Sequence, residues 1–420
     1  MTTDSTLLGV AVALTLLAGL CASASSTKPT LDVQQITFGP KHHFFGYIGH
    51  VRTIPWNASG RYILALQTDF QDHMPAPHEA ADIILIDTQR DYAIRAIDRT
   101  RAWNFQQGTM LYWSPEAPET QLFFNDRDPA TGKVFTVLFD IAQGPTGGRL
   151  REFRYDDTPF GNSGVGQNGG YFLGLNYGRL ARLRPVTGYP GALDWTAGVR
   201  HPADDGIFRV TTATGERRLL VSFAQLRDAL QGRHPNVAEH ALFINHTLSN
   251  RDDDRIYFYV RGAFDDRERR VNIPCTINPD GTGLTEQQFI GGHPEWELGH
   301  RMIGASGDRL VLYDTDTQET LATIGGPSIF PRPGGDTALS PDAEWIVSGY
   351  NDGSGNAYVL YRRSDGAWAR TRHFDQAGFI SGDLRCDPAP CWNRDGTQVL
   401  FPSIAEDAER TRQLFLIRLP

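Results

Sequence analysis

Short runs of alternating apolar and polar residues, separated by turn residues, recur along this chain. In residues 41–69, KHHFFGYIGHVRTIPWNASGRYILALQTD, two such runs flank the turn residues 57–60. Alternation with a period of two, interrupted by Asn, Ser and Gly, is typical of antiparallel strands joined by a turn. The pattern predicts a hairpin with strands at 50–56 and 62–68. It places His50 at the start of the hairpin and His73 just past its end.

The same strand-turn-strand unit occurs six more times. The further copies are 108–126, 169–180, 246–262, 293–314, 336–351 and 389–403. Most are followed by a third and a fourth run, as in 81–97, 134–141, 206–223 and 271–290. Four short strands repeated seven times, at a spacing of about 40 to 60 residues, indicate an all-β, seven-bladed β-propeller.

Two segments fall outside the repeat but fit the same architecture. Residues 33–38 are expected to add a strand to the last blade, beside 413–419, and so to close the ring. Residues 223–242 are the one stretch that reads as helical. Because no linker interrupts the array, we expect a single propeller domain over residues 25–420.

The N-terminal residues have the pattern of a targeting segment. Residues 7–20 are an unbroken run of apolar and small side chains, followed by Ala22-Ser23-Ala24. An apolar run of this length before small residues predicts a signal peptide over 1–24, and hence a secreted or periplasmic protein. The run is too short to span a bilayer.

The charge of the chain limits its partners. The formal net charge is −9, which argues against binding nucleic acid through counterion release. An anionic carbohydrate is not excluded, because a local group of arginines can reverse the sign of the field inside a cleft.

Propeller geometry converts positions in the repeat into positions in space. In each blade the start of the first strand, the end of the second strand and the loop that follows all lie on one face, so their residues converge on one mouth of the ring. The starts are His50, Gln107, His246, His293, Asp336 and Cys386-Asp387; the ends and loops carry His73, Arg127, Tyr177, Arg179, Tyr189, Arg200 and Arg261.

Several motifs resemble those of known polysaccharide lyases. They are HHFFGY at 42–47, WNFQQG at 103–108, NYGRLARLRPVTGY at 176–189, DDGIFR at 204–209 and GGHPEW at 291–296. In this order they resemble oligogalacturonate lyases and, more closely, seven-bladed ulvan lyases. The resemblance implies β-elimination at uronate linkages of a sulfated algal polysaccharide, with His and Tyr as acid and base and Arg neutralising the carboxylate.

The resemblance to oligogalacturonate lyases implies a second arrangement. That family uses a histidine and an arginine beside a metal, and His293 and Arg261 match the first two. Asp336 and residues 386–389 stand where the family has histidine ligands, which is a departure from its pattern.

The chemistry of uronate elimination explains the choice of candidate residues. A cation must neutralise the carboxylate before a base removes the weakly acidic C5 proton, and an acid must protonate the leaving oxygen. We expect His50, His73, Tyr189 and Arg200 to be catalytic, and Arg127, Tyr177, Arg179 and Arg261 to bind substrate. We expect no organic cofactor, and a monomer whose partner is an anionic, uronate-containing polysaccharide.

Simpler roles stand beside these functional ones. Tyr189 could pack within its loop, and Arg127 could pair with a neighbouring carboxylate. Trp103 and Phe105 could fill the core. Three other functions stay open: an oligogalacturonate lyase-like enzyme acting on pectin fragments, a carbohydrate-binding propeller without a working base, and a metal-dependent hydrolase.

Four residues at the starts of successive blades suggest a metal site. His246, His293, Asp336 and Cys386 would bring two imidazoles, a carboxylate and a thiolate together, a mixture that suits one structural zinc ion. The alternative is that His293 is catalytic and that Cys386 forms a disulfide with Cys391.

Overall fold

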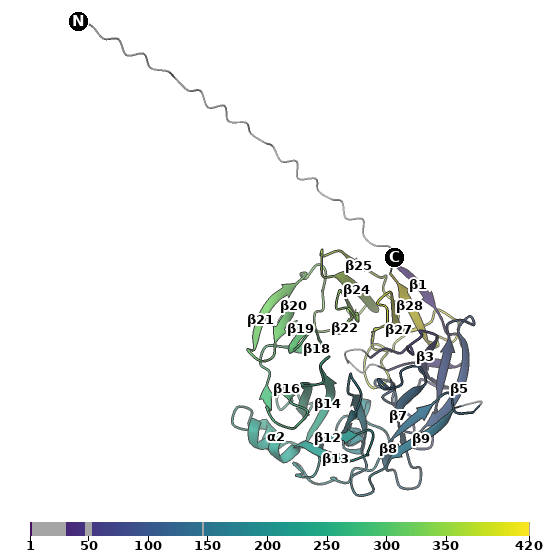
Figure 1. The fold of residues 1–420 in the computed structure, drawn as a ribbon, viewed down its shortest axis with the longest axis vertical. Coiled ribbons are helices and arrows are strands. Elements are labelled where there is room, and N and C mark those ends of the chain that lie inside the picture. The colour runs from purple at the N-terminus through teal and green to yellow at the C-terminus, as the bar shows by residue number, and fades with distance from the viewer. Residues whose placement is uncertain (2–30, 47–52, 145–146, 420) are drawn as a thin grey trace.

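The computed structural model describes residues 1, 31–46, 53–144 and 147–419. Antiparallel sheets of short strands follow one another around a ring, and the chain runs round it in sequence order (Figure 1). The prediction of an all-β propeller is therefore confirmed.

Five separate sheets have four strands each. In chain order the first three comprise β2 (His42–Phe44), β3 (Tyr62–Thr68), β4 (Ala81–Asp87) and β5 (Ala93–Thr100); β6 (Tyr112–Trp113), β7 (Gln121–Arg127), β8 (Val134–Asp140) and β9 (Gly148–Phe153); and β10 (Gly161–Val165), β11 (Tyr171–Leu175), β12 (Gly206–Thr211) and β13 (Arg217–Ser222). The fourth comprises β14 (Leu242–Ser249), β15 (Ile256–Gly262), β16 (Val271–Ile277) and β17 (Thr285–Glu286).

The next eight strands form one continuous sheet. They are β18 (Gly291–Trp296), β19 (Arg301–Ser306), β20 (Arg309–Asp314), β21 (Glu319–Ile324), β22 (Asp336–Leu339), β23 (Trp345–Asn351), β24 (Asn356–Arg362) and β25 (Trp368–Arg370). Its two antiparallel halves meet where β18 and β22 pair in parallel through His293 and Asp336. The described residues thus form five separate four-stranded sheets and one of eight strands, and the predicted count of seven blades is not shown.

The N-terminal strand completes the last sheet. The sheet has the order β1-β28-β27-β26, with β26 at Cys391–Trp392, β27 at Gln398–Ile404 and β28 at Arg412–Arg418. β1 (Asp32–Gln35) pairs antiparallel with β28. This is the closure expected from residues 33–38. It joins the two ends of the propeller through backbone hydrogen bonds.

The helices occupy the connections of the third and fourth sheets. They are α1 (Tyr177–Leu183), η1 (Pro185–Thr187), α2 (Phe223–Leu230) and α3 (Asn236–Glu239). The helical reading of 223–242 is confirmed by α2 and α3, and Ser222 and Gln225 form a capping box at the start of α2. None of the described helices is long and apolar enough to cross a membrane.

Two local expectations were wrong. The strand that pairs with the end of β3 is β2, at His42–Phe44. Of the predicted strand at 50–56, only a single antiparallel bridge between Trp56 and Ile63 is formed, and 50–52 lie outside the described residues. The copy at 169–180 does not continue as a strand past Leu175, because the side chain of Asn176 accepts a hydrogen bond from the Arg179 N–H and begins α1.

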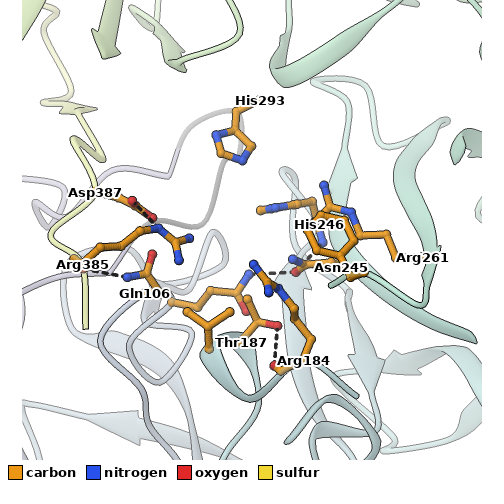
Figure 2. Close-up of a pocket in the computed structure, with 12 residues that line it drawn as sticks. Gln106, Arg184, Thr187, Asn245, His246, Arg261, His293, Arg385 and Asp387 are labelled. Carbon is orange, nitrogen blue, oxygen red and sulfur yellow. Dashed lines mark hydrogen bonds and ion pairs between the residues drawn. The ribbon is translucent and has the colours of Figure 1, made fainter. Parts of the chain in front are cut away.

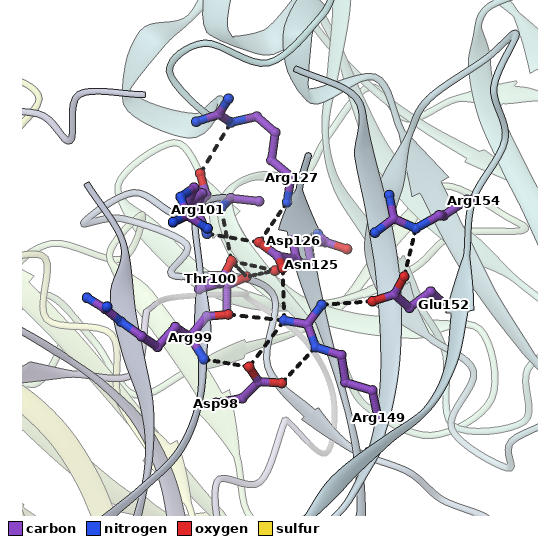
Figure 3. A network of polar contacts seen from close by, with 12 residues as sticks. Asp98, Arg99, Thr100, Arg101, Asn125, Asp126, Arg127, Arg149, Glu152 and Arg154 are labelled. Atoms are coloured by element: carbon purple, nitrogen blue, oxygen red, sulfur yellow. Dashed lines mark hydrogen bonds and ion pairs between the residues drawn. The ribbon is translucent and has the colours of Figure 1, made fainter. Parts of the chain in front are cut away.

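An arginine joins the first sheet to the second. Arg149, on β9, contacts Asp98 on β5 at 2.8 Å, Asp126 on β7 at 2.9 Å and Glu152 at 2.9 Å (Figure 3). The backbone N–H groups of Arg101 and Arg127 also donate to Asp126. The guanidinium is therefore surrounded by carboxylates that come from both sheets, which fixes one sheet against its neighbour.

Candidate active-site cleft

One cleft of about 170 Å³ lies at the end of the ring where several first strands begin. Polar and charged side chains from well-separated parts of the chain point into it (Figure 2). It is lined by Gln106, Gln107, Arg184, Val186, Thr187, Asn245, His246, Arg261, Phe264, His293, Arg385 and Asp387. Sequence analysis placed Gln107, His246, His293, Arg261 and Asp387 at one mouth, and the structure does bring these five together.

His246 lies on the first strand of its sheet in an unusual backbone conformation. Its φ is +60°, and the pairing of β14 with β15 shifts register between Asn245 and Leu248. The Asn245 side-chain oxygen accepts from the His246 N–H at 3.0 Å and from Gln107 Nε2 at 3.0 Å. A strained residue held by its neighbours is a recurrent feature of functional sites.

The charge state of His246 follows from its surroundings. Burial, and then the neighbouring His293 and Arg261, hold the pKa of His246 well below 6.5. The imidazole is therefore neutral at neutral pH. A neutral imidazole has a lone pair available and can act as a proton acceptor.

Three arginines give the cleft its positive character. Arg261, on β15, donates through Nε to Asn272 Oδ1 at 2.8 Å, and its guanidinium lies 4.3 Å from the ring centre of Tyr259. Burial lowers the pKa of Arg261 to about 10, so it stays charged at neutral pH. Burial and the charge of Arg385 also lower the pKa of Arg184, whose guanidinium lies 4.6 Å from the ring centre of Phe264.

Arg385 is the one cleft arginine that contacts a cleft carboxylate. Its Nε donates to Asp387 Oδ1 at 2.8 Å, and Gln106 Nε2 donates to the Arg385 carbonyl at 2.8 Å. Burial and the charge of Asp336 raise the pKa of Asp387 above its usual value. The cleft as a whole contains three guanidinium groups and a single carboxylate among its lining residues.

His293 has a carboxylate partner beneath it. Its Nδ1 lies 2.5 Å from Asp336 Oδ1, and the second oxygen of Asp336 accepts from the Ala389 N–H at 3.0 Å. The rings of His246 and His293 are 5.3 Å apart, centre to centre. Asp336 thereby fixes the orientation of the His293 ring at the edge of the cleft.

The predicted catalytic histidines lie elsewhere. His50 lies outside the described residues. His73 does not line the cleft; it stacks on Phe70 and contacts Asp72 at 2.8 Å and Glu79 at 3.1 Å. Hydrogen bonds to these two carboxylates raise its pKa, so the charged form of His73 is favoured there.

The predicted tyrosines are part of the core. Tyr177 and Tyr189 are almost fully buried and stack on each other with ring centres 4.1 Å apart. The Tyr177 hydroxyl donates to the Asn162 carbonyl, and the Tyr189 hydroxyl accepts from Asn125 Nδ2. Burial raises the pKa of both, so neither position fits direct contact with substrate.

Three predicted arginines also lie outside the cleft. Arg179 is 1 % exposed and donates to the carbonyls of Leu242 and Arg200. Arg127 is 3 % exposed and donates to backbone carbonyls, including that of Pro77. Arg200 is exposed and contacts the Ala238 carbonyl at 3.4 Å. Of the four residues expected to bind substrate, only Arg261 lines the cleft.

The structure does not support the expected four-ligand zinc site. No group of three or more His, Cys, Asp or Glu side chains is arranged to hold a metal ion in the part of the chain that the structure describes. His246 and His293 face the cleft, but Cys386 is buried, and burial raises the pKa of its thiol to about 11. Cys275, Cys386 and Cys391 are free thiols, so the disulfide alternative is wrong.

Sequence reasoning missed Arg184 and Arg385. Arg184 follows α1, a helix that was read as the end of a strand, so its position could not be derived from strand geometry. The Asn176-Tyr177-Gly178-Arg179 sequence carried a usable signal, because Asn is a preferred N-cap residue. Arg385 directly precedes the Cys386-Asp387 pair that was placed at the mouth.

Comparisons with known proteins do not show a family for this chain. No family model and no curated protein matches the chain. Among solved structures, TolB from Acinetobacter baumannii is 11% identical, with 83% of this chain and 78% of that chain covered and a TM-score of 0.38. The β-propeller domain of the Trilobed protease from Pyrococcus furiosus is 12% identical, with coverages of 86% and 94% and a TM-score of 0.45.

The resemblance to ulvan lyases and oligogalacturonate lyases was wrong as a statement of family. The two solved structures named above are a TolB and a β-propeller domain of a protease, and neither is described as a lyase. The physical reason lies in the motifs that suggested it. Phe44, Trp103, Phe105 and Trp296 are all at most 4 % exposed, so much of the motif pattern reports the packing of a propeller core.

Proposed function

We propose that this protein is a lyase that cleaves uronate linkages of an anionic polysaccharide by β-elimination. The observation that carries the proposal is a neutral imidazole, His246, beside three arginines in one cleft. An anionic substrate matches the arginines, and a proton acceptor matches the elimination. In this proposal the eight-stranded sheet counts as two blades, and the propeller has seven.

Arg261 and Arg184 bind the uronate carboxylate. Arg261 makes no ion pair with a carboxylate that lines the cleft. Arg184 is only partly buried and contacts Asp265, an exposed residue outside the cleft lining, at 3.2 Å. A guanidinium presents two parallel N–H donors that match the two oxygens of a carboxylate. Neutralising the carboxylate stabilises the negative charge that develops when the C5 proton leaves.

His246 removes the C5 proton. The electron pair of the C5–H bond forms the C4–C5 double bond, and the bond between C4 and the leaving oxygen breaks. His293, oriented by Asp336, donates the proton that the leaving oxygen takes up. The 5.3 Å between the two imidazole rings allows one to face C5 and the other the glycosidic oxygen.

Ultraviolet absorbance of the unsaturated uronate tests the proposal. The purified protein is mixed with a panel of ulvan, pectin fragments, alginate and glycosaminoglycans, and with a neutral glucan as the control. The proposal is supported if the absorbance rises with a uronate polymer but not with the glucan, and if the rise is lost in His246→Ala. Reducing ends without the chromophore indicate a hydrolase, and binding without any product indicates a carbohydrate-binding propeller.

A further inference from the structure

Two further cavities lie at the opposite end of the first strands from the cleft. Gln106 and Gln107, in the cleft, precede β6, whereas Tyr112 and Trp113 form β6, and Pro115 and Pro118 follow it. One cavity, of about 170 Å³, is lined by Ile54, Leu111, Tyr112, Trp113, Pro115, Pro118, Val165, Gly166, Gln167 and Arg394. A second, of about 500 Å³, is lined by Trp56, Ala58, Ser59, Gly60, Thr88, Tyr92, Asn393, Arg394, Asp395 and Gln398.

Arg394 lines both cavities and connects them. It lies in the turn between β26 and β27, and its Nε donates to the carbonyls of Trp56 at 3.0 Å and Asn57 at 2.8 Å. These two hydrogen bonds hold the Nε of Arg394 against the segment that precedes β3. They use only Nε, so the four N–H groups of the two terminal nitrogens remain available to a ligand.

The charge of Arg394 is not compensated by an ion pair among the described residues. Burial lowers its pKa, and Glu119 is the one carboxylate that opposes this effect. The Glu119 oxygens, however, accept from the N–H and hydroxyl of Ser59 at 2.8 and 2.9 Å. A half-buried cation without a paired anion is costly, and an anionic ligand would remove that cost.

Part of the wall of the smaller cavity is apolar and fixed in place. Trp113 Nε1 donates to the Pro55 carbonyl at 2.7 Å, and the Ala58 N–H donates to the Pro118 carbonyl at 2.9 Å. Aromatic and proline side chains next to a guanidinium suit a ligand that joins a ring to a carboxylate. The ring would lie against the walls and the carboxylate would take the terminal nitrogens of Arg394.

We propose that the Arg394 cavities form a binding site for a carboxylate attached to a ring, distinct from the cleft. A uronate sugar and an apolar ring carboxylate share this chemistry. The site does not depend on the function proposed for the cleft, because none of the residues lining it is among the residues lining the cleft.

Calorimetric titration of the full chain with four small molecules tests the site without any substitution. The probes are glucuronate, its methyl ester, cyclohexanecarboxylate and cyclohexanol. Binding of either carboxylate, at least about tenfold tighter than its uncharged counterpart, shows a carboxylate site on the chain, which the variants below assign to Arg394 or to the cleft. The carboxylate that binds identifies the ring as sugar or apolar. Equal binding of charged and uncharged probes, or no binding of either carboxylate, overturns the proposal.

Three variants then locate the bound carboxylate. Arg394→Gln is expected to weaken binding at least about tenfold, since it removes the charge and the paired donors. Arg309→Gln, an exposed arginine on β20, is the matched control and should bind like the wild type. If binding survives in Arg394→Gln but is lost in Arg261→Gln, the carboxylate occupies the cleft and the second site is excluded. Loss of lyase activity without loss of binding in Arg261→Gln separates the two proposals.

Discussion

Arg261 in the cleft and Arg149 between the first two sheets show what burial does to an arginine with different neighbours. Arg261 contacts the neutral oxygen of Asn272 and an aromatic ring, and burial lowers its pKa. Burial also acts to lower the pKa of Arg149, but hydrogen bonds and charges from Asp98, Glu152 and Asp126 outweigh it and raise the pKa. The charge of Arg149 is balanced by carboxylates within the fold, while Arg261 has a neutral amide oxygen as its hydrogen-bond partner.

The largest effect is expected where the cleft does chemistry rather than binding. His246→Ala should lower kcat/KM by about 10³-fold, because it removes the proton acceptor. The free energy of unfolding should change little, since a neutral side chain at the edge of a cleft is lost. Steady-state rates and denaturant titration measure the two quantities. His73→Ala is the control, and a similar loss of rate there would return the catalytic role to the histidine first expected from sequence.

Removing the unpaired arginine should affect activity more than stability. Arg261→Gln is expected to lower kcat/KM by about 10²-fold, because the developing negative charge loses its counter-charge. Arg261→Lys should recover only part of the rate, since an ammonium group lacks the planar pair of donors. Full activity in both variants would show that the carboxylate is bound by Arg184 or Arg385 instead.

Removing the paired arginine should have the reverse effect. Arg149→Gln leaves Asp98, Asp126 and Glu152 close together without a cation, and should lower the free energy of unfolding by roughly 2 kcal/mol. The activity of the folded fraction should be unchanged. Denaturant midpoints, compared with those of Arg309→Gln, measure the effect; equal midpoints would mean that the network contributes nothing to stability.

A single substitution can give Arg261 a carboxylate partner like those of Arg149. Asn272→Asp places a carboxylate at the Nε of Arg261, where the neutral amide oxygen now lies 2.8 Å away. The new ion pair should compete with substrate and raise KM by roughly tenfold, with a smaller change in kcat. A KM equal to that of the wild type would show that the charge of Arg261 does not need to be free.

The smallest expected effect is on the pH profile. The pKa of His246 lies well below 6.5, so this group stays deprotonated as pH falls from 7 toward 6, and the rate should not follow an ordinary histidine titration. The same depression affects stability. Below pH 6.5 His246 binds a proton in the unfolded chain but not in the folded one. His246 therefore destabilises the fold increasingly as the pH falls below that value. A loss of kcat/KM centred at 6.5 would assign the base to another group.

The architecture followed from the sequence because its signal is local. Alternation and turn residues define each strand, and each copy of the repeat supports the others. The site did not follow as readily. Tyr177 and Arg179 were placed at the mouth on the assumption that a strand continued, and the N-cap at Asn176 begins a helix that buries both. Tyr189 was placed in a loop over the mouth, but its ring stacks on Tyr177 in the interior. His246, His293 and Arg261 were placed correctly because they lie on the strands themselves.

The pairing of β1 with β28 determines when the ring of sheets can close during folding. Asp32 and Arg418, which contact each other at 3.4 Å, are separated by 386 positions in the chain. Synthesis runs from the N-terminus to the C-terminus, so β1 is made long before β28 and the ring stays open until β28 has been made. Until then the sheet that β28 and β1 complete has an unpaired edge. Ring closure pairs strands that are far apart in the sequence, and such non-local pairing is slow. Truncating either end should therefore weaken the whole ring rather than fray one strand.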